Sequence, residues 1–255
     1  MIRALVLAVV ALYSSPLAAQ APPPPKLLVV ISVDQLSSDL FNEYRPQFSA
    51  GLDRIASGAL FRNGSSREPQ GQSLGELMKA RWPDSRNVAV AGRSGLDPIA
   101  GGASDQHWFW AGTKFQSALA DARVPGVVLK VNAAVAAALS QPRPPLDAPP
   151  FCQSRERKSQ LARAAGDALA LAASPELDGD TLALAAGLID EMQLGRRANP
   201  DVLAIDLSAT GNVARSYGAA SEEMCMQLTE LDREIGDFLS LLDARGIDYS
   251  VALHG

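Results

Sequence analysis

The chain has 255 residues, of which 47% are hydrophobic and 20% charged, with a formal net charge of -5 and a pI near 5.1. This length and composition allow one sizeable hydrophobic core and exclude an intrinsically disordered protein. The lysines and arginines are scattered through an acidic chain and form no basic stripe. We therefore expect no nucleic-acid partner.

The first 21 residues resemble a secretory signal peptide. Arg3 is followed by an apolar stretch at residues 4–13 and by a small-residue finish that ends at Ala21. The apolar stretch is too short to cross a bilayer, so we expect no stable membrane insertion after cleavage. The prediction is a signal peptide at residues 1–21 and a single domain at residues 22–255, in a periplasmic or secreted protein.

The two cysteines also relate to the cellular location of the protein. Export leads to an oxidising compartment, in which Cys152 and Cys225 could form a disulfide. Two buried thiols are the alternative, because two cysteines far apart in a sequence do not identify a bond.

The first predicted strand is Lys26-Leu-Leu-Val-Val-Ile-Ser-Val, followed by Asp34. A continuous apolar run of this kind is typical of a strand that is buried on both faces, inside a parallel sheet covered by helices. Asp34 should then stand at the carboxyl end of the strand, the edge of an open α/β sheet where ligands bind. The alternative is that Asp34 caps the helix that follows, a role open also to Ser37.

The rest of the chain alternates between strands and helices. Further strands are predicted at residues 59–62, 87–91, 201–208 and 249–253. Helices are predicted at residues 37–44, 49–57, 73–81, 115–122, 131–139, 155–173, 180–193 and 221–245, with a capping box at the start of the third. Loops are predicted at residues 65–72, 96–112, 142–150 and 209–220. This alternation predicts a three-layer α/β fold with a mostly parallel, doubly wound sheet.

Four stretches carry a family resemblance. They are the first strand with Asp34-Gln35, the segment 201–218 with Leu207-Ser-Ala-Thr and Tyr217-Gly, the helix with Gln227-Leu-Thr-Glu-Leu-Asp-Arg-Glu234, and the last strand with His254-Gly255. In order and spacing they resemble the alkaline phosphatase superfamily, in particular its bacterial exported branch related to nucleotide pyrophosphatases and phosphodiesterases. The resemblance implies hydrolysis of phosphate esters by a Thr or Ser nucleophile activated by two zinc ions. Its ligand would be a small-molecule phosphate ester or inorganic phosphate.

Some positions match the motifs of this superfamily. The resemblance implies that Asp34 is the first metal ligand and that His254 belongs to the last ligand motif. It also implies that Arg93, in Gly92-Arg-Ser-Gly95, is one of two phosphate-holding cations. His107, beside two tryptophans, matches no ligand position and is predicted to be a packed histidine.

Other positions depart from those motifs, and the resemblance is to a shortened member. The segment that holds the nucleophile is missing, and its nearest hydroxyls, the weak candidates for the nucleophile, belong to Ser65 and Ser66. Gly211 and Arg215 stand where the family has an Asp and a His ligand. A guanidinium about 4 Å from a zinc ion is repelled by about 8 kcal/mol at an effective dielectric constant of 20. Arg215 could instead take over the role of a cation that binds phosphate.

Two functional hypotheses follow. The first is an exported alkaline phosphatase-like hydrolase that uses zinc, with Asp34 and His254 among the metal ligands. The second is a catalytically inactive, degenerate member that binds an anion through Arg93 and Arg215. The residues present favour the second hypothesis for this chain.

Overall fold

The computed structural model describes residues 23–60, 72–94, 103–120 and 122–255. Half of the predicted strand at residues 59–62 and all but the last residue of the predicted loop at 65–72 fall outside these ranges. The two described residues of that strand, 59 and 60, are not in a strand.

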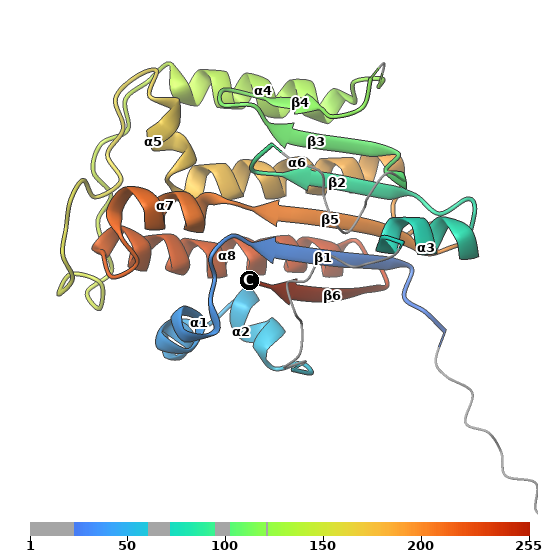
Figure 1. Cartoon of the computed structure of the whole chain (residues 1–255), viewed down its shortest axis with the longest axis horizontal. Helices are drawn as coiled ribbons and strands as arrows, with labels where there is room; N and C mark the ends of the chain where they lie inside the picture. The colour runs from blue at the N-terminus through green and yellow to red at the C-terminus, as the bar shows by residue number, and fades with distance from the viewer. Residues whose placement is uncertain (1–22, 61–71, 95–102, 121) are drawn as a thin grey trace, which may run out of the picture.

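A six-stranded sheet forms the centre of the molecule (Figure 1). Its strands are β1 (Leu27–Val33), β2 (Asn87–Ala91), β3 (Gln106–Trp110), β4 (Phe115–Ser117), β5 (Asp201–Leu207) and β6 (Tyr249–His254). The strand order is β4-β3-β2-β5-β1-β6, and only the β3–β4 pair is antiparallel. The predicted mostly parallel sheet is confirmed. The carboxyl ends of β2, β5, β1 and β6 therefore meet at one edge of the sheet, which we call the carboxyl edge.

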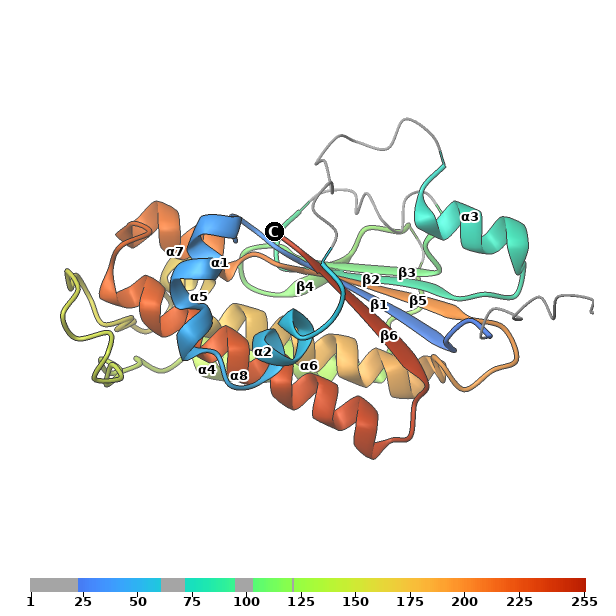
Figure 2. The same cartoon turned by 90° about the horizontal axis from the view of Figure 1, so that it is seen from below.

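Helices cover both faces of this sheet. They are α1 (Ser38–Tyr44), α2 (Gly51–Ala56), α3 (Leu74–Arg81), α4 (Gly126–Leu139), α5 (Ala168–Ala172), α6 (Pro175–Met192), α7 (Ala209–Tyr217) and α8 (Glu222–Ala244), with a 3₁₀ turn at Arg45–Gln47. Figure 2 shows α2, α4, α6 and α8 on one face and α3 on the other. The predicted three-layer architecture is confirmed, and α1 and α7 lie beyond the carboxyl edge (Figure 1).

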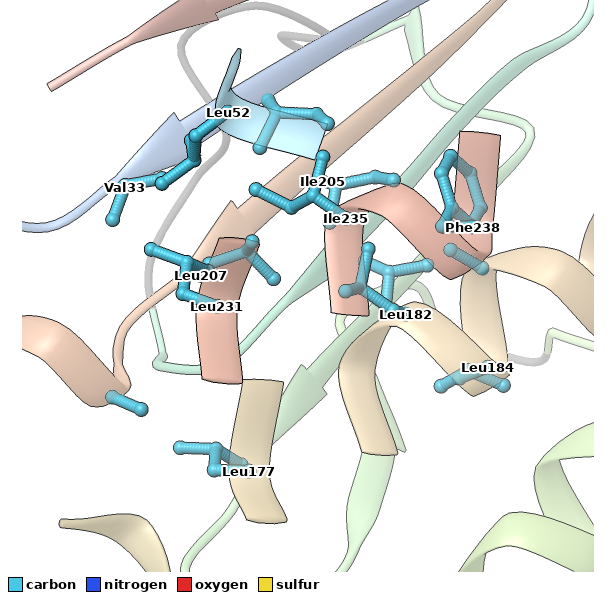
Figure 3. Close-up of a cluster of buried hydrophobic side chains, with 14 of the residues drawn as sticks. Val33, Leu52, Leu177, Leu182, Leu184, Ile205, Leu207, Leu231, Ile235 and Phe238 are labelled. Carbon is cyan, nitrogen blue, oxygen red and sulfur yellow. The ribbon is translucent and has the colours of Figure 1, made fainter. Parts of the chain in front are cut away.

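The main core lies between the sheet and the layer that contains α6 and α8. Figure 3 shows Ile205 of β5, Ile235 of α8 and Leu52 of α2 gathered in one cluster. All three are at most 1% exposed. On the opposite face of the same strands, the small residues Ala89 and Ala204 form a separate buried contact. The alternation of side chains along β5 thus separates a large-residue face from a small-residue face.

Two predictions between β2 and α4 were wrong. Residues 96–112 were expected to be irregular and residues 115–122 helical, but β3 and β4 are strands. β3 is held by pairing with β2, and Trp108 and Trp110 are buried in the core as expected for packing residues. The side chain of Asn132 on α4 accepts a hydrogen bond from Phe115 N at 2.7 Å and donates one to the Phe115 carbonyl at 2.9 Å. These contacts between distant segments override the local helical pattern.

The helix expected at residues 155–173 was also wrong, since only α5 is helical there. Glu223 of α8 accepts hydrogen bonds from the backbone N–H groups of Lys158, Ser159 and Gln160 at 2.5–3.0 Å. Burial alone would raise the pKa of Glu223, but these backbone donors together lower it. The carboxylate thus takes the place of the carbonyl acceptors that a helix would supply to these N–H groups, and the segment is not helical.

The expected loop at residues 209–220 contains α7. Its first N–H, from Ala209, donates to Asp178 Oδ1 of α6 at 3.0 Å. Asp178 is fully buried, and its contact stabilises the start of a helix that the small residues of this segment do not predict. Helix α7 matters because it carries Gly211 and Arg215 to the carboxyl edge.

The Cys152–Cys225 pair forms a disulfide with a Cα–Cα distance of 5.6 Å. Cys152 lies in the segment between α4 and α5, and Cys225 lies in the first turn of α8. The sequence left a disulfide and two buried thiols open, and the structure has the disulfide.

Asp232 of α8 determines how α2 docks. Its carboxylate accepts hydrogen bonds from the N–H groups of Ser49, Ala50 and Leu52 at 2.7–2.9 Å. We expect Asp232→Ala to lower the free energy of unfolding by about 2 kcal/mol, because three N–H groups, including the buried one of Leu52, lose their acceptor. Urea denaturation measures the change, and Asp237→Ala, an exposed carboxylate on the same helix, is the control. Equal stability of the two variants would contradict this role.

Candidate active site

Asp34 follows β1 at the carboxyl edge, as the sequence predicts. Its N–H donates to the Leu207 carbonyl of β5 at 2.9 Å, and its side chain is 14% exposed. The alternative role of helix cap belongs instead to Ser37, whose hydroxyl accepts from Leu40 N at 3.1 Å. The carboxylate of Asp34 is therefore available to other partners.

Two arginines from different elements meet at this carboxylate. Arg93, just after β2, places Nη1 at 3.3 Å from Asp34 Oδ1. Arg215 of α7 places Nη1 and Nη2 at 3.3 Å from Asp34 Oδ2. We call Arg93 and Arg215 the arginine pair. The structure thus brings together three of the residues that the sequence singled out.

Each guanidinium has a second partner that holds it in place. Arg93 Nε donates to Asp206 Oδ2 of β5 at 2.9 Å, and Asp206 Oδ1 accepts from the Ser32 hydroxyl at 2.9 Å. Arg215 Nη2 donates to Asn212 Oδ1 at 2.6 Å, one turn earlier on α7. The sheet register puts Ser32 directly beside Asp206, which explains their contact.

Asp206, Ser32 and Asn212 were not predicted as site residues. The sequence does single out two of them: Ser32 and Asp206 are polar residues near the carboxyl ends of two mostly apolar strands. Because side chains alternate along a strand, Ser32 and Asp206 point to the face of the sheet opposite to the residues on either side of them, which lie in the core. The parallel pairing of β1 with β5 then places the two side by side. The role of Asn212 depends on α7, which was expected to be a loop.

Gly211 lies against the carboxylate of Asp34. A Cβ at this position would stand 2.0 Å from Asp34 Oδ2, so any larger residue must displace that side chain. The family's Asp at this position is therefore incompatible with the present orientation of Asp34. The absent side chain leaves the space in which Asp34 reaches Arg215.

The four charged groups balance. Asp34 and Asp206 carry two negative charges, and the arginine pair carries two positive ones. The carboxylates are 14% and 13% exposed, whereas Arg93 and Arg215 are 56% and 53% exposed. Water screens ion pairs of this kind, so each contributes about 1 kcal/mol or less to stability. The exposed guanidinium groups remain accessible to a dissolved anion.

His254 is the last residue of β6 and pairs with Ser32 in the parallel ladder, with its side chain exposed. Across the described ranges, no three His, Cys, Asp or Glu side chains are grouped so that they could hold a metal ion. Asp34 already faces two guanidinium groups, which repel a dication. These residues therefore do not fit the two-zinc centre that the resemblance implies.

The remaining candidates lie elsewhere. Ser65 and Ser66, the predicted sources of a nucleophile, are outside the described residues. His107 of β3 is 2% exposed in the core, which confirms that it is a packed histidine.

Comparison with known proteins agrees with the fold and with the resemblance. The family "Type I phosphodiesterase / nucleotide pyrophosphatase" matches residues 74–254, a range that includes Arg93, Arg215 and His254. The chain is 34% identical to alkaline phosphatase PhoK of Sphingomonas sp. and 29% identical to alkaline phosphatase PhoD of Zymomonas mobilis. These alignments cover 90% and 89% of this chain but 54% and 52% of the relatives. The chain thus spans about half the length of these relatives.

The alignment with the Sphingomonas protein has a further property. It extends over 304 positions, more than the 255 residues of this chain. Residues of that relative without a counterpart here therefore lie inside the matched region.

The solved structure of wild-type alkaline phosphatase PafA shares the fold. Its TM-score is 0.71 at 17% sequence identity, and the match covers 91% of this chain and 62% of that one. At this identity the likeness concerns the fold alone. By the family match over residues 74–254 and the relation to PhoK, this chain belongs to the type I phosphodiesterase/nucleotide pyrophosphatase family of the alkaline phosphatase superfamily.

Proposed function

We propose that this chain is an alkaline phosphatase-like protein whose ligand is the phosphate group of a small-molecule phosphate ester, bound at the carboxyl edge. The observation that carries the proposal is the convergence of the arginine pair, from two elements far apart in the sequence, on one point of that edge. Guanidinium groups bind phosphate oxygens through paired, charge-assisted hydrogen bonds. Family membership supplies the class of ligand.

Two outcomes are open for the bound ester, and we propose binding without turnover. Hydrolysis in this family type needs metal ligands and a nucleophile. For this chain the candidates are Asp34 and His254 as ligands and Ser65 or Ser66 as nucleophile. Against hydrolysis stands the ion pairing of Asp34 with two guanidinium groups, where a zinc ion would meet positive charge.

Hydrolysis remains the competing candidate because the PhoK and PhoD relatives are named alkaline phosphatases. It would require zinc to displace the arginine pair from Asp34 and to recruit further ligands. The two candidates therefore differ in their metal content as well as in turnover.

We also propose that the protein is exported to the periplasm or secreted. The leader at residues 1–21 has the pattern of a signal peptide, and a disulfide is typical of oxidising compartments. Among the described residues, no helix combines the length and the apolar character that a membrane span requires.

One experiment separates binding from hydrolysis. The purified chain is stripped with a chelator, reloaded with zinc, and assayed for metal by mass spectrometry and for nitrophenol release from an aryl phosphate. We expect no retained zinc and no release. Inorganic phosphate should still bind in calorimetry, and Arg93→Gln should weaken that binding. Arg196→Gln, an exposed arginine at the amino end of β5, is the matched control. Two equivalents of zinc together with turnover would establish the hydrolase instead.

A further inference from the structure

We infer that Asp34 acts as a built-in competitor for phosphate: its carboxylate occupies the arginine pair and must be displaced before an anion can bind there. This inference rests on the proposed function and adds a specificity-determining residue to it. It also assigns Asp34 a role other than that of a metal ligand.

The first argument is the chemistry of the contact. A carboxylate and a phosphate present the same kind of paired oxygen acceptors to a guanidinium group. Asp34 uses both oxygens in this way, Oδ1 toward Arg93 and Oδ2 toward Arg215. It thus holds the inner positions that a phosphate bridging the arginine pair would take.

The second argument is that the arginine pair does not depend on Asp34 for its position. Arg93 is anchored by Asp206, which is itself held by Ser32. Arg215 is anchored by Asn212 at 2.6 Å, shorter than its contacts with Asp34 at 3.3 Å. If Asp34 loses its charge, both guanidinium groups keep a partner and remain at the carboxyl edge.

The third argument is the charge balance. With Asp34 ionised, the four groups have no net charge, so a phosphate dianion gains little from approaching them. Without that charge the site becomes a net cation with two half-exposed guanidinium groups. Removing one negative charge next to a bound dianion changes its affinity by about tenfold or more, even when water screens much of the interaction.

The test compares the dissociation constant for inorganic phosphate in the wild-type chain and in Asp34→Asn. Calorimetry at low ionic strength with a chelator present excludes binding through zinc. We expect Asp34→Asn to bind phosphate at least about tenfold more tightly. Asp147→Asn, an exposed carboxylate between α4 and α5, makes the same change in net charge and should bind like the wild type. Asp34→Ala serves as a second variant, and circular dichroism checks that each protein is folded.

The outcomes separate this inference from the proposed function. Wild-type binding that is unchanged or weakened in folded Asp34→Asn and Asp34→Ala would overturn the inference and leave phosphate binding intact. Absence of binding in all the folded proteins would overturn both. Weak wild-type binding that tightens in Asp34→Asn, and is lost in Asp34→Asn/Arg215→Gln, would support both.

Discussion

Reduction of the Cys152–Cys225 disulfide is expected to lower the free energy of unfolding by about 4 kcal/mol. The bond joins residues separated by 73 positions, and opening so long a loop restores much conformational freedom to the unfolded chain. The native structure loses little, because Glu223 and the Arg157–Glu222 ion pair also hold the segment between α4 and α5 on α8.

Urea denaturation with and without a reductant measures this effect. The Cys152→Ala/Cys225→Ala variant should match the reduced wild type and should not respond to the reductant. Wild-type stability that is the same in both conditions would show that the bond constrains the unfolded chain little. A variant that responds to the reductant would point to a cause other than this disulfide.

The second large effect expected is a loss of stability at alkaline pH. Burial raises the pKa of Glu234 on α8 to about 9, and the neighbouring charge of Asp178 adds to that rise. The side chain is 15% exposed, and its Oε2 has no hydrogen-bond partner among the described residues. It borders a cavity of about 220 Å³ between α6 and α8, with Leu182 and Phe238 in its walls. The folded protein therefore favours the protonated form of Glu234.

Two further carboxyls on α6, the buried Asp178 and the partly buried Asp180, add to this effect. Burial raises the pKa values of Asp178 and Asp180 to about 7, the latter with help from the charge of Glu176. In Asp178 the hydrogen bonds from Ala209 and Gln227 lower the pKa and thus oppose part of the rise.

The direction of the pH dependence of stability follows from the number of protons bound in the folded and unfolded states. For each of these acids the folded-state pKa lies above the unfolded-state value near 4, so the folded protein binds more protons at intermediate pH. The stabilisation is fully present below about pH 4 and is lost as pH rises through 7 and then 9. Each acid contributes a slope of about 1.4 kcal/mol per pH unit within its own window. For Glu234 the window extends from about 4.5 to 9, which gives an upper limit of about 6 kcal/mol.

Urea unfolding at pH 5, 7 and 9 tests this prediction. The wild type should lose stability over the whole range, and Glu234→Gln should be nearly flat between pH 7 and 9. Glu230→Gln makes the same charge change on α8 at a side chain that is 39% exposed, and it should follow the wild type. If the wild type is equally stable at pH 5 and 9, Glu234 is ionised in the folded protein.

The sequence alone determined the architecture and the place of the site. β1, β2 and β5 are short apolar runs that are largely buried, and the strands predicted there agree with the structure. β6, at the edge of the sheet, was also predicted as a strand. The caps of α1, α3 and α8 at Ser37, Ser73 and Ser221 lie within the local sequence, and those helices were predicted near their observed bounds. Asp34 could be placed at the carboxyl edge because a strand end fixes a position in a parallel sheet.

Only the tertiary structure decided the rest, since those segments take their hydrogen-bond partners from distant parts of the chain. β4 depends on Asn132, the segment at residues 155–166 depends on Glu223, and α7 depends on Asp178. The same holds for the site: Asp34 meets Arg93 and Arg215 only because β2 and α7 bring them to one edge. The local sequence determines a helix or strand whose hydrogen-bond partners are close in the sequence. A segment whose partner is a side chain far away in the sequence takes its conformation only when the chain folds and brings the two together.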